Sequence, residues 1–227
     1  MIRAMALDDT DCEQFVRTHA RLLTPPLVPE VPLYLADEAI VLWTKTESLP
    51  GVLPGTGTRP PPYWAFAWPG GQALARYLID HPAEVARRTV LDFGSGSGLV
   101  AIAAAKAGAY CVCAAETDPL ALAAIELNAA ANGVFIEPLS QDLIGTNSRW
   151  NIVLAGDMFY ERPLAERLLP WLRELARAHA RVLIADPGRA YFPREGVRKL
   201  ATYSIPTSRE LEDRDIRETS VYELAAL

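Results

Sequence analysis

The feature that most constrains this chain is a glycine-rich turn between an apolar run and an alanine-rich run. The apolar run spans 89–93 and the alanine-rich run spans 99–106, and glycines alternate with serines between them: Gly94, Gly96 and Gly98. This order predicts a buried strand, a sharp turn and a helix. Backbone N–H groups at such a helix start can meet a ligand directly. We therefore expect an α/β fold with a nucleotide-like ligand at this turn.

The spacing of the glycines separates two cofactor classes. A dinucleotide fingerprint would have its third glycine where Leu99 stands. Asp92, just before the turn, would oppose a pyrophosphate but could receive an ammonium group, which S-adenosylmethionine carries. The run Asp92-Phe-Gly94-Ser-Gly96-Ser-Gly98 resembles the motif of seven-strand methyltransferases that use this cofactor. S-adenosylmethionine is therefore expected, and a dinucleotide-dependent oxidoreductase is the less favoured alternative.

Length and charge limit the other possibilities. A chain of 227 residues, 50% of them hydrophobic, accommodates one α/β domain with a short N-terminal extension. We expect the extension over 1–62 and the methyltransferase domain over 63–227. The formal net charge of −6 argues against nucleic acid as a partner, because nucleic-acid binding normally requires a basic surface. The N-terminus has no long apolar segment, which predicts a cytoplasmic protein without membrane contact, and we expect a monomer.

Cysteines and histidines suggest no further chemistry in the sequence. Three cysteines, Cys12, Cys111 and Cys113, provide no even disulfide framework and are interpreted as reduced core thiols. The three histidines are scattered and lack the spacing of a metal site. The sequence therefore predicts no metal centre.

The remaining pattern predicts a Rossmann-like seven-strand sheet, mostly parallel. The expected helices span 8–23, a segment beginning at Pro69, 99–106, 120–131 and 163–179, the last kinked or broken at Pro170. The expected sheet strands span 89–93, 110–115, 134–139, 150–156, 181–185, 200–205 and 220–224, the last two closing the sheet as an antiparallel pair. A further short strand is expected at 39–43, before a long loop at 49–63.

Polar residues at the predicted strand ends are candidates for cofactor binding. Glu116 lies 24 positions after Asp92, about the βαβ distance at which an acidic side chain accepts ribose hydroxyls. The alternative for such a carboxylate is an interaction with a helix dipole, which describes Asp118 better. Asp142 could meet an adenine edge or simply lie in a surface loop. The expected cofactor residues are Trp68, Asp92, Gly94, Ser95, Gly96, Gly98, Glu116, Thr117 and Asp142.

Four segments together resemble one family. They are Tyr63-Trp-Ala-Phe-Ala-Trp-Pro-Gly-Gly-Gln-Ala-Leu-Ala-Arg-Tyr-Leu78, the run from Val90 to Gly98, Gly156-Asp-Met-Phe-Tyr160 and Asp186-Pro-Gly-Arg189. In combination they are similar to the electron transfer flavoprotein β-subunit lysine methyltransferases, over roughly residues 60–225. The segment 55–60 also faintly resembles the ribosomal protein L11 methyltransferases. That family usually carries a separate N-terminal recognition domain, for which the stretch before the core is too short.

The resemblance implies a protein-lysine methyltransferase whose partner is the flavoprotein β-subunit, with acceptor lysines in its recognition loop. Asp157 would accept a hydrogen bond from the lysine amine, and Phe159 and Tyr160 would wall a lysine channel. Trp64 and Glu161 would contact the substrate. In the alternative interpretation the aromatic residues merely pack and Asp157 caps the next helix. Another protein, such as a ribosomal protein, or a small amine remains an alternative substrate.

Overall fold

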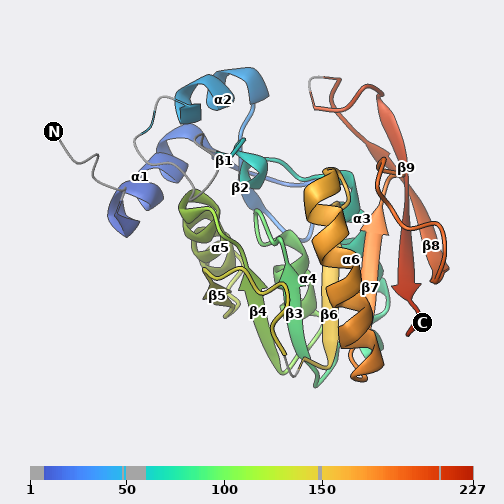
Figure 1. The fold of residues 1–227 in the computed structure, drawn as a ribbon. Helices are drawn as coiled ribbons and strands as arrows, with labels where there is room; N and C mark the ends of the chain where they lie inside the picture. Colours follow the sequence, from blue (N-terminus) through green and yellow to red (C-terminus); the bar gives the residue numbers. More distant parts are fainter. Residues whose placement is uncertain (1–7, 48, 50–59, 148–149, 210, 227) are drawn as a thin grey trace, which may run out of the picture.

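The computed structural model describes residues 8–47, 49, 60–147, 150–209 and 211–226. Its centre is a seven-stranded sheet in the order β5-β4-β3-β6-β7-β9-β8 (Figure 1). The strands are β3 (Thr89–Phe93), β4 (Cys111–Ala115), β5 (Glu137–Leu139), β6 (Ile152–Gly156), β7 (Arg181–Asp186), β8 (Val197–Pro206) and β9 (Ile216–Leu224). The strands from β5 to β7 are parallel, and β9 is antiparallel to both β7 and β8. The predicted Rossmann-like sheet with its antiparallel end is confirmed.

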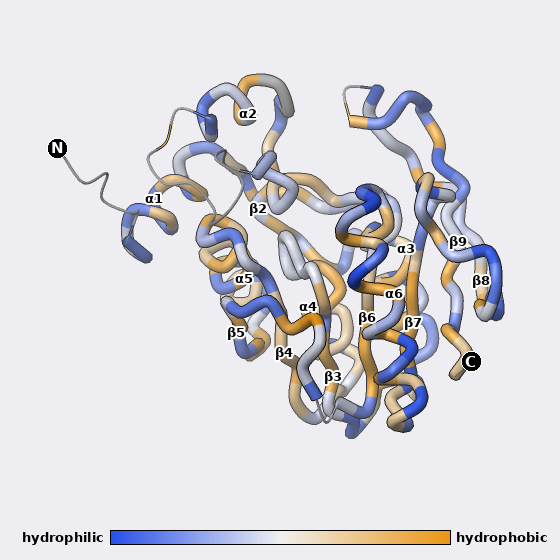
Figure 2. The backbone as a smooth tube through the Cα atoms, viewed as in Figure 1, coloured by the Kyte–Doolittle hydropathy of each residue, from blue (hydrophilic) through white to orange (hydrophobic). Residues whose placement is uncertain are grey.

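Helices cover both faces of the sheet. Three of them, α3 (Pro69–Asp80), α4 (Leu99–Lys106) and α5 (Pro119–Ala131), contribute to one apolar cluster with one face. On the other face, α6 (Arg162–Arg177) packs through Leu168, Trp171 and Leu172. The central strands between these layers are predominantly hydrophobic, as Figure 2 shows. Burial on both faces explains why the central parallel strands β3, β4, β6 and β7 are largely apolar, whereas the edge strand β5 is not.

Smaller elements lie before and after α3 in the chain. They are α1 (Asp9–His19), β1 (Arg21–Leu23), β2 (Leu33–Leu35), α2 (Ala39–Glu47) and the short 3₁₀ helices η1 (Tyr63–Ala65) and η2 (Pro82–Glu84). A third apolar cluster joins Cys12 and Val16 of α1, Leu42 of α2 and Trp64 of η1 to α5. The N-terminal elements are thereby attached to the edge of the core that carries β4 and β5 (Figure 1).

Two predictions for the N-terminal region are wrong. The expected strand at 39–43 is the first half of α2, in which Leu42 is buried and Trp43 donates to Glu47 one turn later. The helix expected to reach residue 23 ends at His19, because residues 21–23 pair with β2. In both places tertiary contacts override the local pattern. Most of the predicted loop at 49–63 lies outside the described residues.

Other boundaries differ less. Of the kink or break predicted at Pro170, the break is absent, since α6 continues through this residue. Pro170 is exposed, so water can satisfy the carbonyl that loses its hydrogen bond. β5 begins three residues later than expected, at Glu137, whereas β8 and β9 extend beyond the predicted segments.

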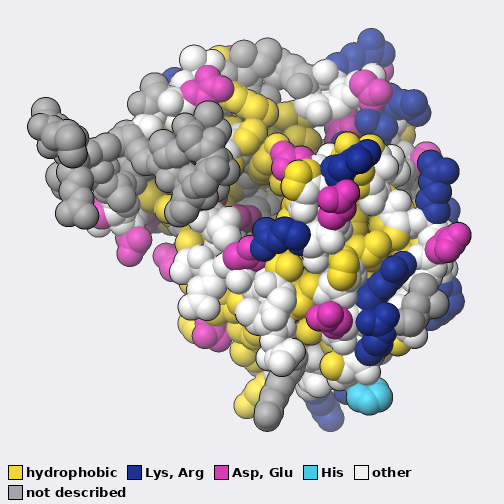
Figure 3. Space-filling model, in the orientation of Figure 1, with side chains coloured by type: hydrophobic (Ala, Val, Ile, Leu, Met, Phe, Trp, Pro, Cys, Tyr) yellow, Lys and Arg dark blue, Asp and Glu magenta, His cyan; other side chains and the backbone are white. Residues whose placement is uncertain are grey.

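Lysine and arginine side chains gather over α6 and the C-terminal strands on the face shown in Figure 3. Among the helices in the described ranges, none combines the length and apolar character needed to cross a bilayer.

Candidate active site

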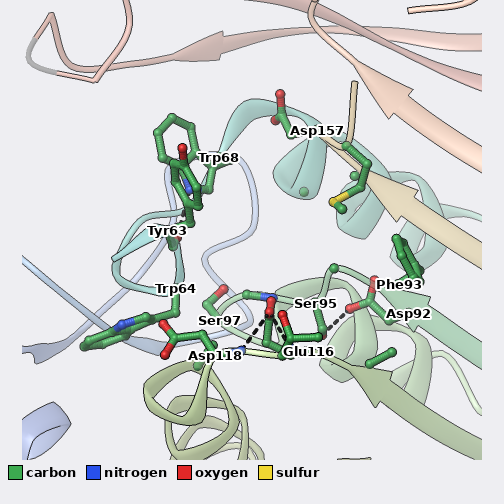
Figure 4. A pocket seen from close by; sticks show the side chains of 18 of the residues that line it. Tyr63, Trp64, Trp68, Asp92, Phe93, Ser95, Ser97, Glu116, Asp118 and Asp157 are labelled. Carbon is green, nitrogen blue, oxygen red and sulfur yellow. Dashed lines mark hydrogen bonds between the residues drawn. The ribbon is translucent and has the colours of Figure 1, made fainter. Parts of the chain in front are cut away.

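A cleft of about 480 Å³ opens at the carboxyl ends of the central strands. It is bounded by the ends of β3, β4 and β6, by η1 and by the start of α3. Figure 4 shows Ser95 and Glu116 on one side of it, with Trp68 and Asp157 on the other. Ligands of open α/β sheets bind at this position, where the strand order reverses. The cleft brings together these residues from the sequence prediction: Trp64, Trp68, Asp92, Gly94, Ser95, Gly96, Glu116, Thr117, Asp142, Asp157 and Tyr160.

The glycine-rich turn forms the floor of the cleft. Gly94, Gly96 and Gly98 have φ angles of 66°, 53° and 82°, in the left-handed region that other residues rarely adopt. A Cβ at Gly94 would lie 2.2 Å from Sδ of Met158, but this is the end of a flexible side chain that can move, so the positive φ angle is the stronger reason for glycine here. Gly98 is the N-cap of α4 and does not line the cleft itself. Its contribution is the backbone turn into the helix.

Asp92 is buried at the end of β3. Its Oδ2 accepts hydrogen bonds from Ser95 Oγ at 2.5 Å and from the N–H of Ala101 at 3.1 Å. Burial raises the pKa of this carboxyl to about 7, against the lowering effect of these two donors. The Asp92 carboxylate therefore fixes the turn and would gain stability from a cationic ligand.

Glu116 follows β4 and faces the same turn. Its Oε2 accepts from the N–H of Gly96 at 3.1 Å, and its Oε1 accepts from the N–H of Thr117 at 2.7 Å (Figure 4). Burial raises the pKa of Glu116. These hydrogen bonds place both oxygens at the cleft wall, where the sequence predicts the ribose hydroxyls. Asp118, next along the chain, caps α5 instead, as its side chain accepts from the N–H of Leu120.

Asp142 also lines the cleft. It accepts from the N–H of Ile144 at 3.0 Å and forms an ion pair with Arg167 of α6. Burial raises the pKa of Asp142, but the hydrogen bond from Arg167 and that from Ile144 outweigh it, so the net shift is downward. An adenine edge could still reach the remaining acceptor positions.

Asp157 is held by two donors at the end of β6. Its Oδ2 accepts from the N–H of Gly70 in α3, and its Oδ1 accepts from Nε of Arg189 at 2.8 Å. Its φ angle is 59°, a conformation that Asp and Asn tolerate better than most residues. Burial raises the pKa of Asp157, although Arg189 opposes the shift. Each oxygen keeps a further lone pair, so the carboxylate can accept an additional hydrogen bond from the cleft.

The close packing at Gly70 explains why the Trp-Pro-Gly-Gly segment has glycine at this position. A Cβ at Gly70 would lie 2.6 Å from the carbonyl oxygen of Ala185 and 2.6 Å from the backbone nitrogen of Asp157. Only glycine therefore lets α3 approach the ends of β6 and β7 this closely. Pro69 at the first turn of α3 aligns the N-terminus of the helix toward Asp157.

Sequence reasoning assigned no partner to Arg189, which in the structure pairs with Glu212 as well as with Asp157. Its Nη2 donates to Oε1 of Glu212 at 2.6 Å, and Glu212 also accepts from Nε of Arg217 at 2.8 Å. Glu212 is 5% exposed and follows β8 by several residues. Interactions with Asp157 and Glu212 raise the pKa of Arg189 above its usual value, although burial opposes this shift. The buried chain Asp157, Arg189, Glu212 connects the cleft to the β8–β9 connection.

Aromatic residues form the wall opposite the glycine turn. The indole N–H of Trp68 donates to the carbonyl of Tyr63 at 2.8 Å, and the rings of Tyr63 and Tyr160 lie 5.4 Å apart. Trp64 lines the cleft but is 1% exposed and also belongs to the core beneath it. Tyr63 belongs to the aromatic segment before Pro69 and lines the cleft, although it was not among the predicted site residues. Tyr160 is partly exposed, and burial raises its pKa.

Two predicted substrate residues lie elsewhere. Phe159 is fully buried and packs against Phe192 with ring centroids 5.7 Å apart, so its prediction as a channel wall is wrong. Phe159 and Tyr160 point in different directions, and of these two only Tyr160 lines the cleft. Glu161 is exposed at the N-cap of α6 and does not line the cleft.

The charge of the cleft fits a cationic ligand. Its lining includes five carboxylates, those of Asp92, Glu116, Asp118, Asp142 and Asp157. Two guanidinium groups line it among the described residues, and both are already paired, Arg167 with Asp142 and Arg189 with Asp157. A sulfonium and an ammonium group are favoured here, whereas a pyrophosphate would meet uncompensated acids.

Solved structures share the fold. A putative RNA methyltransferase from Pyrococcus horikoshii matches with a TM-score of 0.54 at 14% identity, covering 97% of this chain and 98% of that chain. Magnesium protoporphyrin IX methyltransferase from Synechocystis, with bound S-adenosylmethionine, matches with a TM-score of 0.50 at 17% identity. It covers 68% of this chain and 78% of that one.

Sequence relatives identify the branch. The family model for ribosomal protein L11 methyltransferase matches residues 50–158. The electron transfer flavoprotein beta subunit lysine methyltransferase of Danio rerio is 37% identical over 222 residues, covering 94% of this chain and 83% of the relative. The Homo sapiens protein of the same name is also 37% identical, covering 86% of this chain and 75% of the relative. On this evidence the chain belongs to the electron transfer flavoprotein beta subunit lysine methyltransferase family and has the fold of S-adenosylmethionine-dependent methyltransferases.

Proposed function

We propose that this enzyme transfers methyl groups from S-adenosylmethionine to lysines of the electron transfer flavoprotein β-subunit. The observation that carries the cofactor assignment is the acidic cleft beside the left-handed glycine turn. The substrate assignment rests on the names of relatives that match over most of both chains. The cofactor supplies an electrophilic methyl group on a sulfonium, and the protein supplies its binding and the orientation of the acceptor.

Each residue expected to bind the cofactor has a role that follows from its position in the cleft. Glu116 would accept hydrogen bonds from the ribose hydroxyls, since both its oxygens lie at the cleft wall beside Thr117. Asp92 holds the turn through Ser95 and favours positive charge nearby. Asp142 would lie at the adenine end, and Trp68 would pack against the ligand from the opposite wall. Gly94 and Gly96 contribute backbone and no side chains of their own to the floor.

Asp157 is the residue we assign to the lysine amine. It lies in the cleft wall at the end of β6, and its donors Gly70 and Arg189 fix the direction of the carboxylate. A lysine amine that donates a hydrogen bond to this carboxylate would direct its lone pair away from it, toward the methyl group. Because the amine must be neutral to attack, exclusion of water from the cleft also favours the reaction.

Tyr160 would guide the lysine chain. Its ring and that of Tyr63 lie 5.4 Å apart at the cleft, an aromatic pair that could contact an incoming aliphatic chain or its ammonium group. Trp64 lies deeper in the same wall. Glu161, exposed beside Tyr160 at the start of α6, would contact the surface of the protein substrate.

The alternative substrate is another protein or a small amine. The ribosomal protein L11 methyltransferase of Alteromonas mediterranea is 41% identical over 85 residues, but these cover 37% of this chain and 25% of the relative. That coverage supports shared cofactor chemistry more than a shared substrate. Cytoplasmic location, a monomeric state, absence of nucleic-acid binding and a domain boundary near residue 62 remain predictions from the sequence.

Calorimetric titration tests the cofactor assignment. We expect S-adenosylhomocysteine to bind in a one-to-one ratio and NAD to produce no heat of binding at comparable concentrations. Binding of NAD without binding of S-adenosylhomocysteine would contradict the proposal and favour an oxidoreductase.

A further inference from the structure

Two thiols and a carboxylate meet outside the cleft. Cys111 and Cys113 occupy alternate positions of β4, so their side chains lie on the same face of the sheet. Parallel pairing places Glu137 of β5 directly opposite Cys113. The sequence did not reveal this group, because Glu137 is 24 residues from Cys113 and becomes its neighbour only through the register of the sheet. None of the three residues lines the cofactor cleft.

The ligand atoms of the three residues lie close enough together to share one metal ion. Sγ of Cys113 lies 3.3 Å from Oε2 of Glu137, and the ligand atoms of all three residues lie within 4.8 Å of one another. A tetrahedral zinc ion with ordinary bond lengths requires such ligand atoms about 3.5–3.8 Å apart. Small side-chain rotations would therefore complete three corners of the coordination sphere, without movement of the backbone.

We propose that Cys111, Cys113 and Glu137 bind one thiophilic divalent cation of the zinc class, with a water molecule in the fourth position. Both thiols lose their protons on binding, so two thiolates and one carboxylate surround the ion and the complex carries one net negative charge. Thiolate and carboxylate ligands in this number suit zinc or cadmium better than magnesium or calcium, which prefer oxygen alone. Glu137 is exposed and Cys111 is partly exposed, which provides an entry path to the site.

The location of the group indicates a structural role. β5 has three residues, forms the edge of the sheet and, within the described ranges, pairs with β4 alone. An ion held by Cys111 and Cys113 on one strand and Glu137 on the other would fasten this edge strand to the sheet. Because the ligands lie outside the cleft, the ion should stabilise the fold without changing cofactor affinity. The site does not depend on the proposed methyl acceptor.

Cadmium titration of reduced, chelator-treated protein tests the proposal. We expect the ultraviolet thiolate-to-cadmium charge-transfer band to rise to saturation at one equivalent, and zinc to raise the melting temperature. Cys111→Ser and Glu137→Gln should each weaken binding by about tenfold or more, because each removes one of three protein ligands. Matched controls are Cys12→Ser, which removes a buried thiol from another cluster, and Glu126→Gln, which neutralises an exposed carboxylate on α5.

Two outcomes would overturn the proposal. One is the lack of a saturable charge-transfer band at one equivalent in the wild-type protein. The other is unchanged affinity in Cys111→Ser or Glu137→Gln. Neither variant alters a fully buried residue, unlike Cys113→Ser, so misfolding does not confuse the result. Melting curves of the metal-free variants verify that they fold, and titration with S-adenosylhomocysteine verifies that the cleft remains intact.

Discussion

Alanine substitutions at Gly70 and Gly71, two adjacent glycines of α3, should have different effects on the free energy of unfolding. A Cβ at Gly70 would lie 2.6 Å from the carbonyl oxygen of Ala185 and from the nitrogen of Asp157, and 2.7 Å from Oδ2 of Asp157. Two of these three atoms belong to the backbone, so a side-chain rotation cannot relieve the contacts. At Gly71 the nearest atom would be Cδ2 of Leu99 at 3.9 Å, an ordinary contact.

The expected free energies follow from these distances. Overpacking a rigid core position costs about 1–3 kcal/mol, and the gain in helix propensity on replacing glycine is at most about 1 kcal/mol. Gly70→Ala should therefore lower the free energy of unfolding by about 2 kcal/mol and slow methyl transfer, because α3 must move away from Asp157. Gly71→Ala should leave that free energy unchanged or raise it by up to about 1 kcal/mol.

Urea unfolding followed by tryptophan fluorescence measures both variants, and single-turnover methyl transfer measures the displacement of Asp157. Equal stability of the two variants would refute the argument that α3 is placed by the close approach of Gly70. A destabilised Gly70→Ala protein with unchanged methyl transfer would show that this approach stabilises the fold but does not position Asp157.

Three further predictions test the site. Glu116→Gln should weaken binding of S-adenosylhomocysteine by about 1.5–3 kcal/mol, as for a hydrogen bond to a charged group, while the melting temperature stays close to that of the wild type; unchanged calorimetric affinity would remove Glu116 from the site. Asp157→Asn, which suits the left-handed backbone, should slow single-turnover transfer about a hundredfold with cofactor affinity within a few-fold, and equal losses in both would mean a purely structural role. The pKa values of Asp92 and Asp186 are raised to about 7 and about 6, so the native state binds more protons than the unfolded state in this range, and each group should add stability as the pH falls from about 8 to about 5. Asp92→Asn should remove part of that gain in urea unfolding, and an identical pH dependence in the variant would contradict the raised pKa.

The sheet could be predicted from the sequence because its signals are local. The run 89–93, the three glycines and the helix that follows are consecutive, and each carries its own pattern. Glu116 was identified because the βαβ unit fixes its distance from Asp92. The strand expected at 39–43 was wrong because a run of five apolar residues is compatible with either a strand or a helix. Two features of the structure separate the helix from a strand: the contacts of Leu42 with the core and the hydrogen bond from Trp43 to Glu47.

The polar connections of the site could not be predicted, because they join distant segments. Arg189 meets Glu212, which lies 23 residues later in the connection between the edge strand β8 and β9. Phe159 is buried and Tyr160 lines the cleft because of the backbone path of the loop after β6. No periodicity in the sequence predicts that path. Gly70 carried a partial signal, since glycine at the second position of a helix is unfavourable unless close packing requires it.

The most direct test of the central claim is peptide mass spectrometry of the electron transfer flavoprotein of the same organism. The purified flavoprotein is incubated with the enzyme and isotopically labelled S-adenosylmethionine, with Asp157→Asn as the matched control. We expect labelled methyl groups on lysines of the β-subunit, their loss when those lysines are replaced by arginine, and a strongly reduced yield with the control. Methyl groups on ribosomal protein L11 together with an unmodified flavoprotein would contradict the proposed substrate, even if every cofactor residue were assigned correctly.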